Sequence, residues 1–289
     1  MLQTTAAAEV VVPGRPRSQV VNRVVLYLLL AGVALLFFVP FLWSLVTSFK
    51  TIPDSVNVTF IPHPFSTAGW RELWTQYDFK LYLRNSLFLA VVVTATNMFL
   101  GALGGYAFAR LRFPGRELLF LAVLGTLMIP DQLRLIPVFV LLTNWHLIGG
   151  FTGYILISCV TATNLFFMRQ YFLTIPRDYE EAAKLDGAGH FKTFWRVMLP
   201  LAAPAIAALT ILQFQGTWND FFWPLIIFGQ GNQSHYTVQL GLAQFVLTYQ
   251  TNWPALMAGS VIAILPILAI FIAFQRYFVA GVAAAGVKG

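Results

Sequence analysis

The stretch VVLYLLLAGVALLFFVPFLWSLV, residues 24–46, contains no charged residue. A helix needs about 20 predominantly apolar residues to cross the hydrocarbon core of a bilayer. Five further apolar runs of similar length follow in the chain, and the mean hydropathy is +0.73. These features predict an all-α polytopic membrane protein with six transmembrane helices. The six predicted spans are residues 24–46, 86–108, 118–142, 153–172, 202–228 and 256–278.

Lysine and arginine residues lie mainly at one end of the predicted spans. Thirteen of them belong to residues 1–23, the loop 110–117, the segment 169–196 and the stretch from residue 276 to the end, whereas four lie between Lys50 and Arg84. By the positive-inside rule, both termini and the segment 169–196 are cytoplasmic. The predicted organisation is an N-terminal tail at 1–23, a six-span domain at 24–279 and a C-terminal tail at 280–289.

Composition also argues against several other classes of protein. The formal net charge of +7 does not indicate a nucleic-acid partner, because the basic residues cluster between apolar runs as topology signals do. The single cysteine, Cys159, excludes an intramolecular disulfide. Residues 1–23 lack the apolar core of a cleavable signal peptide, so we expect the first span to remain as an anchor.

The segment 169–196 is unusually polar for this chain, with nine of the 29 charged residues. Pro176 and the acidic residues after it suit the first turn of a helix, and Asp186-Gly187 suits its end. A second short helix is predicted next, and its aromatic and apolar residues are spaced to share one face. From the residues alone, this segment is either a solvated loop resting on the bilayer or a docking element. The predicted shared face comprises Phe191, Phe194, Trp195 and Met198.

The same segment resembles the EAA loop of ABC importer permeases. Other parts of the chain resemble the carbohydrate-uptake branch of that family, of the maltose and glycerol-phosphate type. The resemblance extends from about residue 20 to the last residue and favours the shorter, six-span partner of the permease pair. It rests on Glu181-Ala182-Ala183, Asp186-Gly187-Ala188, Phe194, Val197 and Leu199-Pro200, and outside the loop on Asn85-Ser86, 106–116, Trp218-Asn219-Asp220, Trp223-Pro224-Leu225, 275–281 and 287–289.

The resemblance implies that the loop at about 173–200 couples the permease to a cytoplasmic ATPase. Glu181 would meet a polar surface of the ATPase, the two alanines after it would permit close contact, and Gly187 would turn the chain. We therefore expect aspartate at position 187 to block the turn and uncouple transport. The implied coupling residues are Glu180, Glu181, Ala182, Ala183, Asp186, Gly187, Ala188 and Phe191.

The resemblance also implies the setting in which the chain works. It indicates transport of an oligosaccharide, disaccharide, sugar phosphate or polyol by alternating access, in the cytoplasmic membrane of a bacterium or archaeon. The expected partners are a second permease, an ATPase dimer, an extracytoplasmic binding protein and membrane lipid. No lysine follows a glycine, so the phosphate-binding GK[ST] motif is absent, and ATP and Mg are expected in the partner ATPase rather than as cofactors of this chain.

Polar side chains inside predicted spans are energetically costly and so indicate functional sites. Asp131 and Arg134 equally suit a structural ion pair between helix neighbours, and Trp218 equally suits the interfacial aromatic belt. The third span is also interrupted by Pro130 and Pro137. The candidates for the substrate path are Asp131, Arg134, Asn164, Gln213, Trp218, Asn219 and Asp220.

Two smaller features and two alternative functions complete the sequence-based predictions. Gly101 and Gly105 form a GxxxG pair that favours close packing within the chain, and an interfacial helix is expected near Ala68–Tyr77. A secondary transporter driven by an ion gradient is the alternative function, although no inverted repeat is visible. A membrane-embedded enzyme is disfavoured, because the four histidines are scattered and no nucleophile motif is present.

Overall fold

The computed structural model describes residues 17–229, 233–246 and 251–286, and the side chains of residues 22–275 within those ranges. Within them, every regular element is a helix, apart from one antiparallel bridge between Val246 and Thr251. The predicted all-α class is therefore confirmed. Residues 1–16 and 287–289, which belong to the two predicted tails, lie outside the described residues.

Four helices in the described part of the chain are long and apolar enough to cross a membrane. They correspond to the predicted first, second, fourth and sixth spans. The described helix α1 begins at Arg17, within the predicted N-terminal tail, and α15 continues to Gly286, within the predicted C-terminal tail. The four segments are Asn22–Thr47 in α1 (Arg17–Thr47), α4 (Phe79–Arg110), Phe151–Thr174, and Trp253–Gln275 in α15 (Trp253–Gly286).

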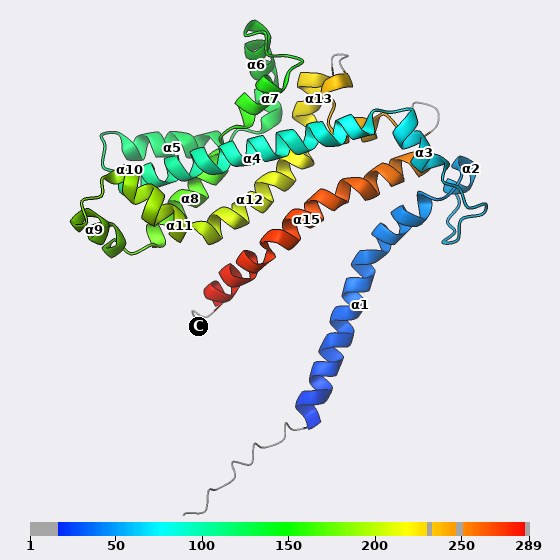
Figure 1. Cartoon of the computed structure of the whole chain (residues 1–289), viewed down its shortest axis with the longest axis horizontal. Coiled ribbons are helices and arrows are strands. Elements are labelled where there is room, and N and C mark those ends of the chain that lie inside the picture. The colour runs from blue at the N-terminus through cyan, green and yellow to red at the C-terminus, as the bar shows by residue number, and fades with distance from the viewer. Residues whose placement is uncertain (1–16, 230–232, 247–250, 287–289) are drawn as a thin grey trace, which may run out of the picture.

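The predicted third span is broken. Helix α5 (Arg116–Thr126) and helix α6 (Asp131–Asn144) are separated by four residues and bent by 101° relative to each other. Figure 1 shows α6 turned across the direction of α5. The segment 118–142 is therefore not one continuous helix, and the break lies at the interruption expected around Pro130, which lacks a backbone N–H and stops the ladder of helical hydrogen bonds.

The predicted fifth span at 202–228 also ends earlier than expected. Helix α12 runs from Ala203 to Trp218, and the rest of the predicted span forms the separate helix α13 (Phe222–Phe228). On the other side, α12 is bent by 75° from the short helical segment His190–Leu201. If each bent pair is one span, the chain has up to six spans in its described part.

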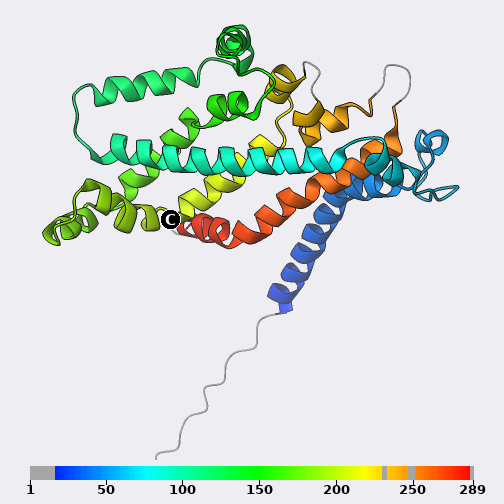
Figure 2. The same ribbon diagram turned by 45° about the horizontal axis from the view of Figure 1, so that its top comes forward.

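The fourth span is interrupted as well, although its two halves continue one another. It consists of α7 (Phe151–Ser158) and α8 (Ala162–Thr174), separated by Cys159, Val160 and Thr161. The central helix α4 packs along α8 and α12, and α12 packs on α15. Figure 2 shows α4 running through the middle of the body with these helices around it.

Close packing between α4 and α8 depends on the predicted GxxxG pair. A Cβ atom at Gly105 would lie 2.7 Å from the Met168 Cβ and 2.8 Å from the Arg169 backbone nitrogen. A Cβ atom at Gly101 would lie 3.4 Å from the Asn164 Cβ. The small residues therefore let two helix backbones of the same chain approach each other, as the sequence predicted.

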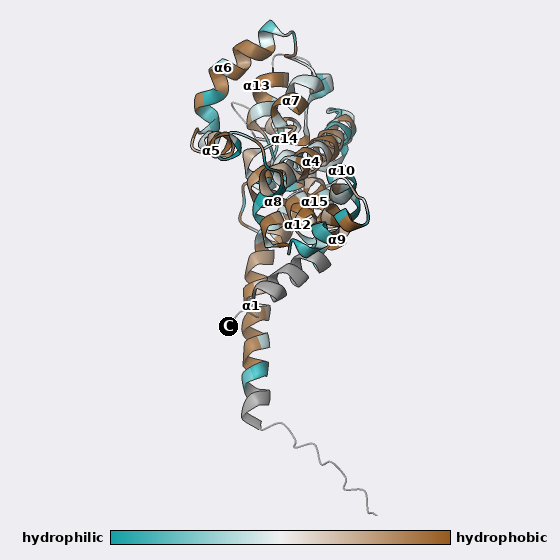
Figure 3. Ribbon diagram, turned by 90° about the vertical axis from the view of Figure 1, so that its left-hand side faces the viewer, coloured by the Kyte–Doolittle hydropathy of each residue, from teal (hydrophilic) through white to brown (hydrophobic). Residues whose placement is uncertain are grey.

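Helix α1 stands apart from the body and packs mainly on α15. Its apolar side chains from Val24 to Val39 are exposed in the chain. Figure 3 shows α1 as a largely hydrophobic rod leaving the body, whereas α9 (Asp178–Leu185) is hydrophilic. A membrane or another membrane protein must cover this apolar surface.

The short elements gather at the two ends of the long helices (Figure 1). The expected interfacial helix is present as α3 (Ala68–Thr75), which packs on the start of α15. The end that contains α3 also holds α2 (Ile52–Ser55) and α14 (Val238–Ala243). The opposite end holds α9, α10 (His190–Thr193), a π-helical turn at Phe194–Met198 and α11 (Leu199–Leu201).

Candidate functional site

The polar segment forms a helix that ends in a glycine turn. Helix α9 has acidic residues in its first turn, where the helix dipole stabilises negative charge. At its other end, the Gly187 N–H donates to the Lys184 carbonyl at 3.0 Å and the Ala188 N–H donates to the Ala183 carbonyl at 2.9 Å. With Gly187 at φ 73°, these bonds make a Schellman cap. The predicted helix, glycine corner and second helix are all present.

One face of α9 packs on its own chain through an arginine that the sequence analysis did not select. The Arg110 Nε lies 3.1 Å from the Glu180 Oε1, and both side chains are almost fully buried. The Arg110 Nη2 also donates to the Phe172 carbonyl at 2.5 Å and to the Ile175 carbonyl. Arg110 thus joins the end of α4, the end of α8 and the start of α9. In the sequence, only the position of Arg110 directly after the second predicted span indicated that it could have a role.

The opposite face of α9 and the turn after it are open. Leu185 is 90 % exposed and Phe191 is 68 % exposed, which is unusual for apolar side chains at an aqueous surface. The predicted coupling residues therefore divide into two groups. Glu180 and Ala183 face the chain itself, Ala188 is half-buried, and the exposed group comprises Glu181, Ala182, Asp186, Gly187 and Phe191.

The four residues predicted to share one apolar face after the glycine turn differ in their exposure. Phe194 and Met198 are buried, whereas Phe191 and Trp195 are exposed. The two buried residues begin and end the π-helical turn, and the Trp195 ring lies 6.1 Å from that of Phe191 and 5.6 Å from that of Phe194 between centroids. The Phe194 ring packs on Tyr106 with centroids 5.3 Å apart, so this residue anchors the loop to α4.

A buried polar network joins three helices in the middle of the body. The Asn164 Nδ2 donates to the Asn97 Oδ1 at 2.7 Å and to the Gln213 Oε1 at 2.8 Å. The Asn97 Nδ2 donates to the Ser158 carbonyl at 2.9 Å, at the break between α7 and α8. Broken helices are tolerated in membranes where side chains satisfy the freed backbone groups. Asn164 and Gln213, both predicted for the substrate path, therefore hold helices together, and Asn97 was missed.

Asp131 and Arg134 form an ion pair at the start of α6. Both side chains are about half exposed, and they line a pocket of about 470 Å³ between the α5–α6 bend and the α7–α8 break. The structural alternative predicted for this pair is therefore present. The pair also faces open space, which keeps both residues available to a solute.

The three candidates at the Trp218 end of α12 have different environments. Trp218 is 1 % exposed, and its Nε1 donates to the Ala263 carbonyl at 2.9 Å, so it packs in the core rather than in an aromatic belt. Asp220 accepts a hydrogen bond from the Tyr154 hydroxyl at 2.9 Å. Asn219 is exposed and accepts from the Gln239 Nε2 at 3.2 Å. Asn219 thus remains the most open of the three.

An exposed face of α12 brings Asn219 into line with a residue that was not selected from the sequence. Leu212, Gln215 and Asn219 are all exposed, at helical spacings of three and four residues. A Cβ atom at the neighbouring Gly216 would have no other atom within 4 Å. This face therefore offers amide groups beside open space along half of the helix.

The family assignment follows from a match over more than half of the chain. Residues 97–284 match the family model described as binding-protein-dependent transport system inner membrane component. The chain belongs to this family. As a binding-protein-dependent inner membrane component, it is a multi-pass transport subunit of a prokaryotic inner membrane and not an enzyme. Membership also implies a partner permease, an ATPase and a substrate-binding protein.

Several relatives of this family member have names that state their transport systems. The chain is 36 % identical over 275 residues to the arabinooligosaccharides transport system permease protein AraQ of Bacillus subtilis, covering 93 % of this chain and 97 % of that protein. It is 33 % identical over 243 residues to the diacetylchitobiose uptake system permease protein NgcG of Streptomyces coelicolor, covering 82 % and 80 %. The sn-glycerol-3-phosphate transport system permease protein UgpE of Yersinia enterocolitica is 31 % identical over 263 residues, covering 88 % and 93 %.

A solved structure shares the fold of this permease. It is a bacterial ABC transporter involved in the import of the acidic polysaccharide alginate, and the superposition has a TM-score of 0.78. The match covers 92 % of this chain and 99 % of the other, at 24 % sequence identity. At that identity, the comparison establishes the fold and leaves the transported compound to other observations.

Proposed function

We propose that this protein is the membrane-spanning permease subunit of a carbohydrate ABC importer. The observation that carries the proposal is the capped helix α9, which exposes one face and an apolar tip at the basic end of the bundle. Relatives named for arabinooligosaccharides, diacetylchitobiose and sn-glycerol 3-phosphate support a carbohydrate or a related phosphate ester as the cargo. These relatives give no support to the ion-gradient alternative.

The exposed face of α9 would couple the permease to its ATPase. Leu185 and Phe191 are apolar, so seating them in a hydrophobic cleft of the ATPase would remove exposed surface from water. Glu181 lies beside them and would meet polar groups at the rim of the cleft. Because Arg110 holds Glu180 against α4 and α8, a movement of α9 would be transmitted to both helices.

The substrate path would follow the exposed face of α12. Gln215 and Asn219 carry amide groups that can donate to and accept from sugar hydroxyls. Asp131 and Arg134 lie at another open pocket and would contribute if the two permeases close around the same cavity. Asn164, Gln213 and Trp218 would instead keep the helices in place, since their polar atoms already have partners in the chain.

The substrate-binding protein would dock at the end opposite to α9. The segment between α2 and α3 exposes several apolar side chains there, with Val58 88 % exposed. Apolar side chains gathered at an aqueous surface are typical of a protein interface. The other exposed members of this group are Val56, Phe60, Ile61 and Phe65.

The test is purification of the tagged chain from its native cells in mild detergent, followed by mass spectrometry. We expect a phosphate-loop ATPase and a second permease to copurify. Leu185→Glu should lower recovery of the ATPase about tenfold, because burying an unpaired charge in the interface is costly. The matched variant Val58→Glu, at the other end of the molecule, should leave that recovery unchanged. A chain that purifies alone after intact solubilisation would contradict the proposal.

A further inference from the structure

Three arginines at the end of the bundle that contains α9 surround a pocket of about 540 Å³. Arg112 lies in the loop after α4, Arg116 begins α5, and Arg177 precedes α9. The pocket is also lined by Glu117, whose carboxylate already lies 2.6 Å from the Arg116 Nη2 and 3.4 Å from the Arg169 Nη2. Glu117 therefore already pairs with Arg116 and Arg169.

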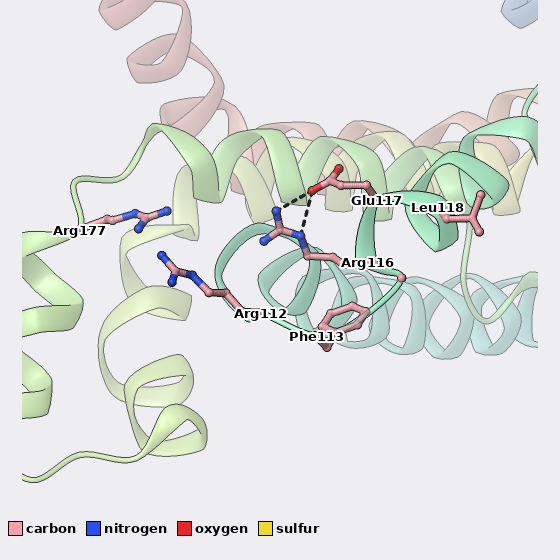
Figure 4. A pocket seen from close by; sticks show the side chains of 7 residues that line it. Arg112, Phe113, Arg116, Glu117, Leu118 and Arg177 are labelled. Carbon is pink, nitrogen blue, oxygen red and sulfur yellow. Dashed lines mark hydrogen bonds and ion pairs between the residues drawn. The ribbon is translucent and has the colours of Figure 1, made fainter.

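Arg112 and Arg177 make no ion pair within the part of the chain that the structure describes. Figure 4 shows their guanidinium groups directed toward the same space, apart from the Arg116–Glu117 pair. A second pocket, of about 440 Å³, adjoins the first and is lined by the same two arginines, by Lys184 and His190, and by Glu181 and the Arg110–Glu180 pair. Two unpaired cations that face one space repel each other. An anion bound between them would attract both and so outweigh that repulsion.

The apolar surroundings of the pocket indicate which kind of anion fits. Leu118 lines the pocket and is 73 % exposed, and Leu121 is exposed one helical turn further along α5. The inner side of α5 packs on the body through Phe120, so the two leucines point away from it. Both leucines lie at the start of the predicted third span, so the acyl chains of a lipid held by the arginines would run along them, a contact that a soluble phosphate does not make.

We propose that this pocket binds the phosphate of an anionic phospholipid in the cytoplasmic leaflet. Arg112 and Arg177 would form charge-assisted hydrogen bonds to the phosphate oxygens, which match the planar guanidinium fork. The acyl chains would run along Leu118 and Leu121 into the bilayer. Basic pockets at the cytoplasmic ends of membrane helices commonly hold anionic headgroups. The leaflet follows from the excess of basic residues at this end of the spans.

The bound lipid would hold the segment around α9 at a second point, in addition to the contact of α9 with Arg110. Arg177 is adjacent to the first residue of α9, and Arg110 already secures the inner face of that helix. A bound headgroup would therefore fix the start of α9 relative to α5. This inference concerns the chain and its lipid, so it can be tested without the ATPase.

The experiment uses the purified full-length chain with phosphatidylglycerol or phosphatidylcholine added, and native mass spectrometry to count retained lipids. We expect the wild type to retain phosphatidylglycerol preferentially. The double variant Arg112→Gln/Arg177→Gln should lose about thirtyfold in that retention, at about 1 kcal/mol for each basic residue. The control Lys192→Gln/Arg196→Gln removes two exposed charges from the same end of the molecule and should retain the preference.

Each remaining outcome decides the proposal. Equal retention by the wild type and the Arg112→Gln/Arg177→Gln variant would overturn it. Displacement of the lipid by inorganic phosphate at millimolar concentration would show a phosphate site instead of a lipid site. Unchanged lipid retention with loss of the copurified ATPase in that variant would show that the arginines dock the ATPase. Leu118→Gln should weaken retention of long-chain but not short-chain phosphatidylglycerol, and an equal effect on both would contradict the acyl-chain placement.

Discussion

At the scale of single residues, Gly187 controls the end of α9 through its backbone conformation. Its φ of 73° lies in the left-handed region, which β-branched residues avoid. The sequence analysis predicted that the side chain of an aspartate at this position would block the turn. A Cβ atom at position 187 would meet no atom within 4 Å in this chain, so the restriction is conformational and not steric.

We therefore expect Gly187→Val to weaken coupling more than Gly187→Asn. Valine in the left-handed conformation costs about 1–2 kcal/mol, which corresponds to roughly a 5–30-fold change in an equilibrium. Asparagine tolerates this conformation and serves as the control. The measurement is the amount of ATPase recovered with the tagged chain. Equal recovery for the two variants would contradict a conformational role for Gly187.

Arg110 is the second residue that supports α9, through its contacts with the Glu180 carboxylate and with backbone carbonyls at the end of α8. Arg110→Met would leave Glu180 buried without its cation and would remove the donor to the Phe172 and Ile175 carbonyls. Breaking a buried ion pair from one side typically costs about 3–5 kcal/mol. We expect a lower temperature of unfolding for the chain in detergent.

The double variant Arg110→Met/Glu180→Met provides the control for that prediction. Removing both charges avoids the uncompensated buried carboxylate, so the double variant should be more stable than Arg110→Met alone. If the double variant is destabilised by the sum of the effects of Arg110→Met and Glu180→Met measured singly, the two side chains do not interact.

At the scale of elements, the close packing of α4 on α8 depends on Gly105 having no side chain. Gly105→Ala would place a Cβ atom against Met168 and the Arg169 backbone, and overpacking of this kind typically costs about 1–3 kcal/mol. Gly32→Ala in α1 is the matched control, because a Cβ atom there has nothing within 4 Å. We expect thermal unfolding in detergent to show destabilisation for position 105 only. Equal stability of both variants would contradict the packing argument.

At the scale of the whole molecule, α1 extends an apolar surface that the rest of the chain does not cover. Its contact with the body is made mainly with α15, and its outer side chains, such as Leu36 and Phe37, are exposed. In a pair of permeases, the exposed face of α1 can pack against the second permease.

A photo-reactive residue placed at Leu36 should therefore cross-link to the partner permease in native membranes. The same group at Leu118 on α5 should cross-link mainly to lipid, because that surface adjoins the proposed headgroup site. The products are identified by mass spectrometry. Lipid adducts alone at position 36 would show that α1 faces the bilayer.

The sequence by itself determined the all-α class and the position of the loop around α9. Both follow from local physics: an apolar run satisfies its backbone only as a helix, and proline, acidic residues and glycine mark helix ends wherever the chain goes. The close approach at Gly101 and Gly105 could also be predicted, because a GxxxG pair has the same meaning in any two packed helices.

Only the tertiary structure decided which polar residues face open space. Asn164, Gln213 and Trp218 sit in predicted spans just as Asn219 does, yet their polar atoms are bonded within the chain. The Arg110–Glu180 pair joins residues 70 positions apart, and the unpaired Arg112 and Arg177 are separated by 65. Such encounters depend on how helices cross, and no local pattern encodes them.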